Sequence, residues 1–178
     1  SSETLELVTR SLELGSLTLG GFNVALGPAI EAWSVIERQR IPDERELQQL
    51  KLLVDWTRIQ VNKEARTIYL PHTGMRIDVG GIGKGYAADR AVAEMKRVGV
   101  MGGVVALSGD IKAFGVLPDR KGFPVGIKHP RREEELIAMI DLSDEAVSTA
   151  GDYERFFERD GIRYHHILDP QTLHPAGA

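Results

Sequence analysis

A run of closely spaced glycines in the middle of the chain constrains the fold more than any other feature. Residues 80–85 read Gly-Gly-Ile-Gly-Lys-Gly, and they directly follow residues 75–79, which alternate like a half-buried strand. After the glycines, apolar side chains recur at helical spacing over residues 88–95, and Gly99 is placed to end that helix. The sequence therefore predicts a strand, a tight glycine turn and an amphipathic helix in direct succession.

This glycine turn is compatible with two roles. Glycines between a strand and a helix let backbone N–H groups approach a phosphate, and a helix N-terminus carries about half a positive charge. A purely structural tight turn has the same spacing. The run is not a Walker A motif, since Asp78 and Gly85 stand where the first glycine and the Ser/Thr would be, and Tyr86 replaces the last glycine of a dinucleotide fingerprint. Lys84 favours an anionic ligand.

The rest of the chain alternates helices with short strands. Further helices are expected over residues 3–15, ending near Gly15, over residues 28–35, and from residue 43 onward. Strand-like runs cover residues 58–62, 67–70, 104–107, 111–116, 124–127 and 136–142. Residues 156–167 predict a hairpin, because Asp160 and Gly161 form the pair that a type I′ turn prefers. This order predicts an α+β fold with a mixed, mainly antiparallel sheet and flanking helices.

Length and composition narrow the class of protein. A chain of 178 residues with 42% hydrophobic residues predicts one folded domain over residues 1–178. The net charge of -4 gives no basic footprint for nucleic acid, and the sequence holds no apolar run of about 18 residues that would span a membrane. The chain has no cysteine, so thiolate metal sites and cysteine nucleophiles are excluded.

Other candidate residues follow strand ends. His165 and His166 are adjacent on a strand, so they face opposite ways, and Asp169 is near enough in sequence to orient one of them. A structural histidine pair gives the same pattern. Residues 108–111 and 148–153 each combine small hydroxyls, a glycine and a carboxylate, a pattern typical of ligand loops and of ordinary turns.

Taken together, these segments resemble the ApbE family of FAD:protein FMN transferases in order and spacing. The resemblance is carried by residues 21–28 followed by Trp33, and by residues 77–89, 108–111, 147–153 and 164–172. It implies an ApbE-like fold in which a divalent metal, usually Mg²⁺, polarises the diphosphate of FAD. A Thr or Ser hydroxyl of an acceptor flavoprotein then takes the FMN half and AMP departs. A metal-dependent FAD pyrophosphatase and a non-catalytic FAD-binding module are the alternatives.

The resemblance also assigns roles to individual residues. Six residues fall at positions that resemble FAD contacts: Gly21, Phe22, Asn23, Asp78, Lys84 and Ile167. The backbone carbonyl of Gly81 falls at a metal-ligand position, and His166 is placed at the reaction centre, with His165 as the alternative. The resemblance further implies a periplasmic protein or a lipoprotein that faces the periplasm, although these residues contain no export signal.

Some positions depart from the family pattern. The family usually has Asp where Asn23 stands and Thr where Ala25 stands, and it usually has Gly at the positions of Ser108 and Leu173. Members of the family also carry an N-terminal segment that touches the flavin and a C-terminal segment with metal-ligating Asp and Thr/Ser residues, and neither is found in these residues. We therefore expect an ApbE-like domain that is incomplete at both ends, binds Mg²⁺ weakly and turns FAD over slowly.

Overall fold

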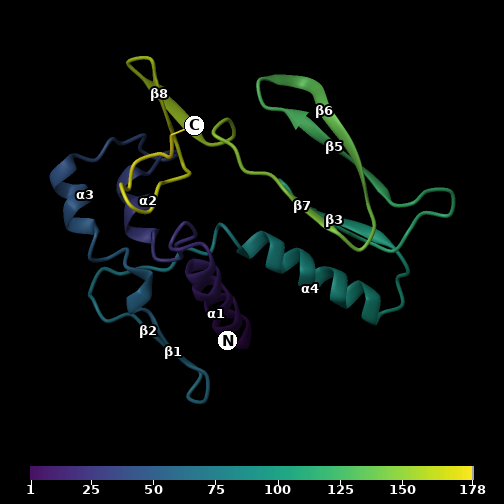
Figure 1. Cartoon of the computed structure of the whole chain (residues 1–178), viewed down its shortest axis with the longest axis horizontal. Helices are drawn as coiled ribbons and strands as arrows, with labels where there is room; N and C mark the ends of the chain where they lie inside the picture. The colour runs from purple at the N-terminus through teal and green to yellow at the C-terminus, as the bar shows by residue number, and fades with distance from the viewer. Residues whose placement is uncertain (178) are drawn as a thin grey trace. The chain divides into compact units, whose positions relative to one another are not determined.

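The structure is a computed structural model that describes residues 1–177, apart from the side chain of residue 133. The chain divides into two compact units (Figure 1). Unit 1 contains Ser1–Gly81 and the chain from Glu154 onward, whereas unit 2 is the continuous stretch Ile82–Tyr153. Each unit is described below by itself.

Unit 1 consists of short helices and two hairpins. Its elements are α1 (Ser2–Leu17), α2 (Gly27–Trp33), α3 (Glu44–Leu50), the 3-10 helix η1 (Trp56–Arg58), β1 (Gln60–Asn62), β2 (Thr67–Tyr69), β8 (Phe156–Arg159) and β9 (Ile162–His165). Side chains cap three of these helices, because Ser1 accepts a hydrogen bond from the N–H of Thr4, Asp43 accepts one from Glu46 and Asp55 accepts one from Thr57. Both hairpins are antiparallel.

Trp33 lies at the centre of one of the two apolar clusters of unit 1. Its side chain is fully buried among residues of α2, α3 and the C-terminal segment, including Leu47, Phe157 and Leu173. The indole Nε1–H donates a hydrogen bond of 2.7 Å to the carbonyl oxygen of Leu173. The other cluster joins α1 to the segments around Val24, Met75 and Ile59.

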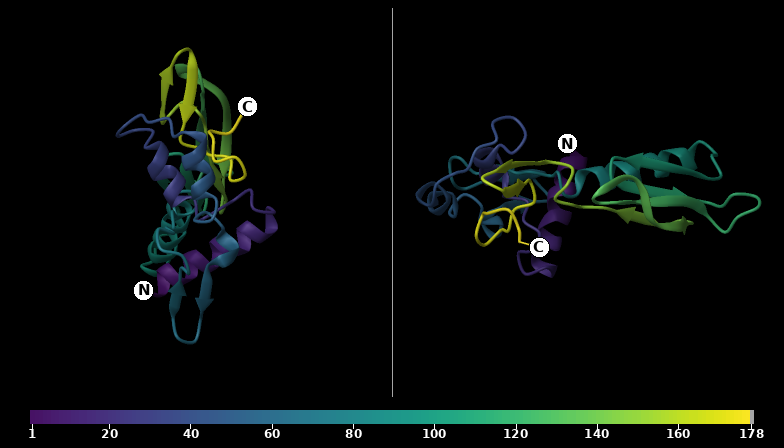
Figure 2. Two further views of the ribbon diagram at one scale, coloured as in Figure 1. Left: turned by 90° about the vertical axis from the view of Figure 1, so that its left-hand side faces the viewer. Right: turned by 90° about the horizontal axis from the view of Figure 1, so that it is seen from above.

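Unit 2 is a helix packed on a small sheet. Its elements are α4 (Gly83–Arg97), β3 (Gly103–Leu107), β4 (Asp110–Phe114), β5 (Phe123–His129), β6 (Arg132–Leu142) and β7 (Ala146–Ser148). The strands pair in the order β3-β4-β7, with β5 and β6 as a separate hairpin, and every one of these pairs is antiparallel. Figure 2 shows α4 running along β3 and β4, the strands against which it packs.

These elements confirm the predicted fold class, an α+β fold with mainly antiparallel strands and flanking helices. The hairpin turn is also confirmed, since Asp160 and Gly161 both have positive φ, at 53° and 75°. None of the helices within residues 1–177 is long and apolar enough to cross a bilayer.

The first helix ends at Leu17, near Gly15 as expected. Two details of the prediction are wrong. Residues 75–79 form no strand; the segment is extended, and the N–H of Asp78 reaches the carbonyl of Val24 at 2.8 Å without a continuing ladder. The helix after the glycines begins at Gly83, so part of the glycine run is its first turn.

The Trp33 contact generates a prediction about stability. Trp33→Phe keeps an aromatic ring but leaves the buried carbonyl of Leu173 without its donor, so we expect a loss of about 1–3 kcal/mol in the free energy of unfolding. Urea unfolding followed by far-ultraviolet circular dichroism measures it. Trp56 is only partly buried, and the matched Trp56→Phe should cost less. Equal stability of Trp33→Phe and the parent protein would contradict the role given to this bond.

Candidate functional site

In unit 1, the segment around Phe22 lies beside the segment that ends at Gly81. A Cβ atom added at Gly81 would stand 3.0 Å from Cε2 of Phe22, so the bare α-carbon lets this ring lie close to the backbone without having to shift. The segment before Gly81 is also tied to the residues after Phe22, through the bond from Asp78 N–H to the Val24 carbonyl. The structure therefore brings together Phe22, Asp78 and Gly81, three of the residues that the sequence analysis selected.

Asp78 and Asn23 both use polar atoms to shape these loops. Asp78 Oδ1 accepts the N–H of Gly80 at 2.8 Å. Asn23 Oδ1 accepts the N–H of Ala25, and its Nδ2 donates to the carbonyl of Val54, each at 2.8 Å. An aspartate at this position would have no hydrogen to donate to Val54, so the bond to Val54 depends on the amide of Asn23.

Lys84 lies in unit 2, on the first turn of α4. The N-cap residue Ile82 makes no side-chain capping bond. Lys84 Nζ is 3.5 Å from Oδ2 of Asp110, the first residue of β4. At Gly85 an added Cβ would have no atom of the described chain within 4 Å beyond its immediate neighbours, so this face of the first turn is open.

The two hydroxyl-glycine-carboxylate motifs interlock in unit 2. The N–H and the Oγ1–H of Thr149 both donate to the carbonyl of Gly109, at 2.9 and 3.2 Å. A Cβ at Gly109 would lie 2.4 Å from Thr149 Oγ1, so glycine is required there. Ser148 donates to Asp110 across the β4-β7 pair. The motifs at residues 108–111 and 148–153 are far apart in the sequence. Neither motif by itself predicts that the two are in contact.

The two histidines of β9 and its end have different surroundings. His165 is partly buried and uses both ring nitrogens: Nδ1 accepts the N–H of Ile167 at 3.3 Å, and Nε2 lies 3.0 Å from the carbonyl of Ala176. This pattern fits a neutral ring with its hydrogen on Nε2. His166 is exposed, with Nδ1 3.3 Å from the carbonyl of Arg155. A hydrogen on that Nδ1 leaves the lone pair of the ring on Nε2.

Asp169 belongs to a turn and not to a histidine. Its Oδ1 accepts the N–H groups of Gln171 and Thr172 at 2.7 and 3.0 Å. The backbone bonds from Thr172 and then Gln171 hold the pKa of the Asp169 carboxyl below its usual range. The hypothesis that Asp169 orients one of the histidines is therefore wrong, because its carboxylate is committed to the turn that follows β9.

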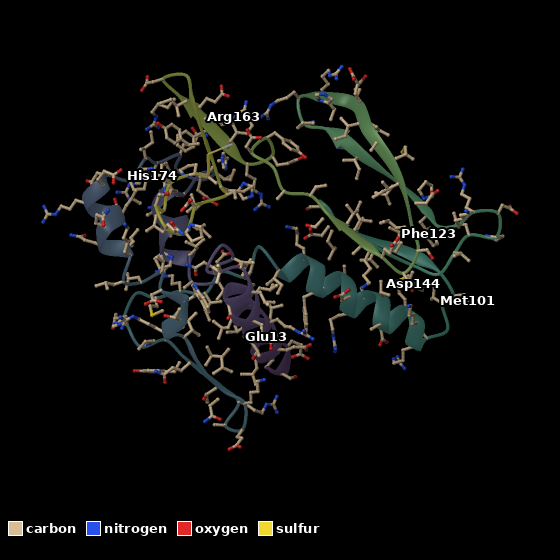
Figure 3. The ribbon with its side chains drawn as sticks, viewed as in Figure 1. Glu13, Met101, Phe123, Asp144, Arg163 and His174 are labelled. Atoms are coloured by element: carbon tan, nitrogen blue, oxygen red, sulfur yellow. The ribbon has the colours of Figure 1, made fainter. Side chains whose placement is uncertain are left out.

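The same turn is connected to α3. His174, labelled in Figure 3, has its Nε2 2.8 Å from Glu44 Oε1 at the start of that helix. Its ring meets Trp33 edge-on with the centroids 5.8 Å apart. The C-terminal motif is thus held against the Trp33 cluster by a side-chain hydrogen bond, a ring contact and the Leu173 carbonyl bond. Sequence reasoning missed His174 and Glu44, which are 130 residues apart.

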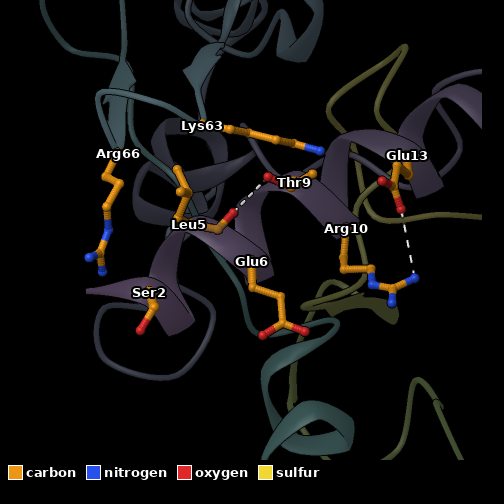
Figure 4. A pocket seen from close by; sticks show the side chains of 8 residues that line it. All are labelled: Ser2, Leu5, Glu6, Thr9, Arg10, Glu13, Lys63 and Arg66. Carbon is orange, nitrogen blue, oxygen red and sulfur yellow. Dashed lines mark hydrogen bonds and ion pairs between the residues drawn. The ribbon is translucent and has the colours of Figure 1, made fainter.

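Surface hollows give little guidance to a binding site. An open depression of about 500 Å³ lies between α1 and the β1-β2 turn and is lined by charged side chains such as Arg10, Glu13 and Lys63 (Figure 4). None of the residues selected from the sequence lines it. A second open depression, of about 480 Å³, includes Asp78 beside Arg76 and α2. We give the glycine segments more weight, because their close backbone approaches require particular residues.

Comparison with known proteins decides the family. The model of the ApbE family matches residues 1–178. The chain belongs to the ApbE family. Among curated proteins, the FAD:protein FMN transferase of Treponema pallidum (strain Nichols) is 34% identical over 96% of this chain, and the FAD:protein FMN transferase of Escherichia coli (strain K12) is 28% identical over 98%. The chain spans about half the length of these relatives, 51% and 52%.

Solved ApbE structures share the fold. The crystal structure of the ApbE protein of Thermotoga maritima superposes with a TM-score of 0.92 at 34% identity, covering 99% of this chain and 58% of that one. The apo form of the flavinyl transferase ApbE of Pseudomonas stutzeri gives a TM-score of 0.80 at 29% identity, covering 96% of this chain and 53% of that one. These structures confirm the ApbE-like fold that the sequence resemblance implied.

The environment of Asp169 generates a pH prediction. Its folded-state pKa lies below the unfolded value, so its charge stabilises the fold above the unfolded pKa and that contribution is lost as the pH falls through the folded pKa. Asp169→Asn keeps an Oδ1 acceptor but loses the charge. We expect it to be less stable at pH 7, by no more than about 1 kcal/mol because water screens the site, with the difference shrinking below about pH 4.

Thermal unfolding of Asp169→Asn and the parent protein across this pH range measures the effect. Asp119→Asn, at an exposed carboxylate of unit 2, is the matched control and should follow the parent protein at every pH. A stability difference for Asp169→Asn that stays constant down to the acid end of the range would contradict the assignment.

Proposed function

We propose that this chain carries out, or forms part of a protein that carries out, transfer of FMN from FAD to a Thr or Ser hydroxyl of an acceptor flavoprotein. The observation that carries the proposal is the match of the ApbE family over the whole chain, together with 34% identity to a protein named FAD:protein FMN transferase. Because the chain spans about half of that relative, the activity is proposed and tested below. The same whole-chain match supports the proposal that units 1 and 2 belong to one ApbE-like domain.

The proposed step is a phosphoryl-group transfer. The hydroxyl oxygen of the acceptor forms a bond to the phosphorus of the FMN half, and the bond from that phosphorus to the bridging diphosphate oxygen breaks. AMP leaves with the bridging oxygen, and the hydroxyl proton passes to a base. Such a reaction asks the protein mainly for positioning and charge stabilisation.

Particular residues are proposed for these tasks. We assign FAD contacts to Gly21, Phe22, Asn23, Asp78, Lys84 and Ile167. Two of these assignments are supported by geometry. The ring of Phe22 lies against Gly81, and the half-exposed Lys84 is next to Gly85, where no described side chain lies within 4 Å of an added Cβ. For Asn23 the proposed FAD contact is made by the backbone of the loop. The side-chain oxygen and nitrogen of Asn23 are both already hydrogen-bonded within the protein.

His166 is the proposed base. The resemblance places His166 there, and His165 is less suited to the role because both of its ring nitrogens bond to backbone groups near Ile167 and Ala176. A His166 ring with its hydrogen on Nδ1 carries the lone pair on Nε2, the form that accepts a proton from a hydroxyl.

Mg²⁺ is the proposed cofactor on the resemblance alone. Within residues 1–177 no group of three or more His, Asp or Glu side chains could hold a metal ion, and the one assigned ligand is the Gly81 carbonyl. A single carbonyl does not make a Mg²⁺ site, which needs octahedral oxygen coordination with one or two carboxylates. When bound, Mg²⁺ would neutralise charge on the diphosphate, and we assign it no step here.

The periplasmic side of a bacterial membrane is the proposed location, again on the resemblance. Fractionation of bacteria that make the protein from its own gene tests it. Recovery with the cytosolic markers would refute the proposal.

Incubation with FAD, Mg²⁺ and an acceptor flavoprotein subunit tests the function. Flavin fluorescence that stays on the denatured acceptor supports transfer, whereas free FMN with AMP supports a pyrophosphatase and intact bound FAD supports a non-catalytic binding module. We expect covalent flavin on the acceptor, and His166→Asn should lower its rate of formation about 100-fold or more, the usual contribution of a general base. His165→Asn is the matched comparison, and a larger loss there than in His166→Asn would reverse the assignment.

The first turn of α4 generates a binding prediction. A side chain at Gly85 meets no described atom within 4 Å, so Gly85→Val should fold normally and yet obstruct the approach of a diphosphate to the helix N-terminus. We expect FAD affinity, measured by titration of flavin fluorescence, to fall at least about tenfold, or ~1.4 kcal/mol. Ala87→Val, also exposed on α4, is the control. Unchanged affinity in a folded Gly85→Val protein would remove the glycine loop as the diphosphate site.

A further inference from the structure

Asp110 connects three elements of unit 2 through one carboxylate. Its Oδ1 accepts a hydrogen bond from the hydroxyl of Ser148 on β7, and its Oδ2 lies 3.5 Å from Nζ of Lys84 on α4. The Asp110 side chain is 16% exposed and the Lys84 side chain 47% exposed. In the sequence, Lys84 and Asp110 belong to separate motifs.

The sheet fixes the direction of this carboxylate. Asp110 is paired with Ser148 in the antiparallel register of β4 and β7, so the serine hydroxyl is always opposite it. The turn before Asp110 is fixed as well, since Ser108 has a φ of 55° and Thr149 holds the Gly109 carbonyl with two hydrogen bonds. One oxygen of the carboxylate is thus taken by the sheet, and the other points to the lysine.

The ion pair has its main consequence in the position of Lys84. A half-exposed pair at 3.5 Å contributes little to stability, because water screens it. Lysine, however, has a flexible four-carbon stem and three donors on its ammonium group. A fixed carboxylate on one side restricts where that group lies and leaves its other donors for an anion.

We infer that Asp110 is a positioning residue that holds the Lys84 ammonium group for the diphosphate of FAD. The inference rests on the proposed function. It also predicts a particular kinetic signature, because the negative charge of Asp110 repels the same diphosphate that its position serves. Removing that charge also removes the repulsion, which partly compensates in the ground state for the less ordered ammonium group. Loss of the Asp110 charge should therefore lower the rate at saturating FAD more than it changes the half-saturating FAD concentration.

Single-turnover release of AMP from FAD measures both quantities, with the full chain in excess of FAD and with Mg²⁺ and the acceptor flavoprotein subunit present. For Asp110→Asn we expect the rate at saturation to fall about tenfold, while the half-saturating concentration changes less than about threefold. Lys84→Met should lower the rate at least as much. Adding Asp110→Asn to Lys84→Met should have no further effect, because Asp110 acts through Lys84.

Asp144→Asn is the matched control. It breaks the ion pair of 2.8 Å between Asp144 and Lys96, which joins α4 to the turn between β6 and β7, and it should leave the rate unchanged. The inference is overturned if Asp110→Asn slows the Lys84→Met protein by the same factor as the parent, or if Asp110→Asn and Asp144→Asn lower the rate equally. A parent protein that neither binds FAD nor releases AMP refutes the proposed function itself, and the inference with it.

Discussion

The hydrogen bond from the indole of Trp33 to the carbonyl of Leu173 joins parts of the chain that are 140 residues apart. The indole is buried, so its N–H requires a partner, and the bond to Leu173 holds the segment after β9 against α2. Phe157 and Tyr164 then stack with ring centroids 5.1 Å apart beside Trp33. This hydrogen bond helps to hold the segment that contains His165 and His166 in unit 1.

Glycines also occur where two segments of the chain lie close together. A Cβ at Gly109 would collide with Thr149, and a Cβ at Gly81 would press against the ring of Phe22, which would have to shift. Gly85 is different, because an added Cβ would meet no described atom within 4 Å outside the adjoining backbone. Packing therefore explains Gly109 and does not explain Gly85.

Local patterns predicted the parts of the fold that local physics decides. The spacing of apolar residues gave α1 and α4, and Asp160 with Gly161 identified the β8-β9 turn because few other pairs adopt positive φ at both positions. The segment before the glycines alternates like a strand, yet a strand also needs a neighbour in register, and residues 75–79 have none in the described structure. Strand β7 was missed because its three residues are held by β4 rather than by their own pattern.

The candidate site divides in the same way. The glycines, His165, His166 and Lys84 were visible as residue types in motifs. Their partners were not, because Asp110 is 26 positions from Lys84 and its direction depends on the register of β4 and β7. Asp169 was assigned to a histidine on proximity in sequence alone, whereas the nearest N–H groups of its own turn take its carboxylate.

The chain order of the two units has a consequence for synthesis on the ribosome. Unit 2 is a continuous stretch between the two segments of unit 1, so its antiparallel neighbours can pair soon after they emerge. Trp33 can be buried by the segment around Leu173 only after another 140 residues have been made, a delay on the order of ten seconds at ordinary rates of elongation. During this interval Trp33 contributes exposed aromatic surface of the kind that promotes aggregation, so unit 1 is more vulnerable than unit 2 until Leu173 has emerged.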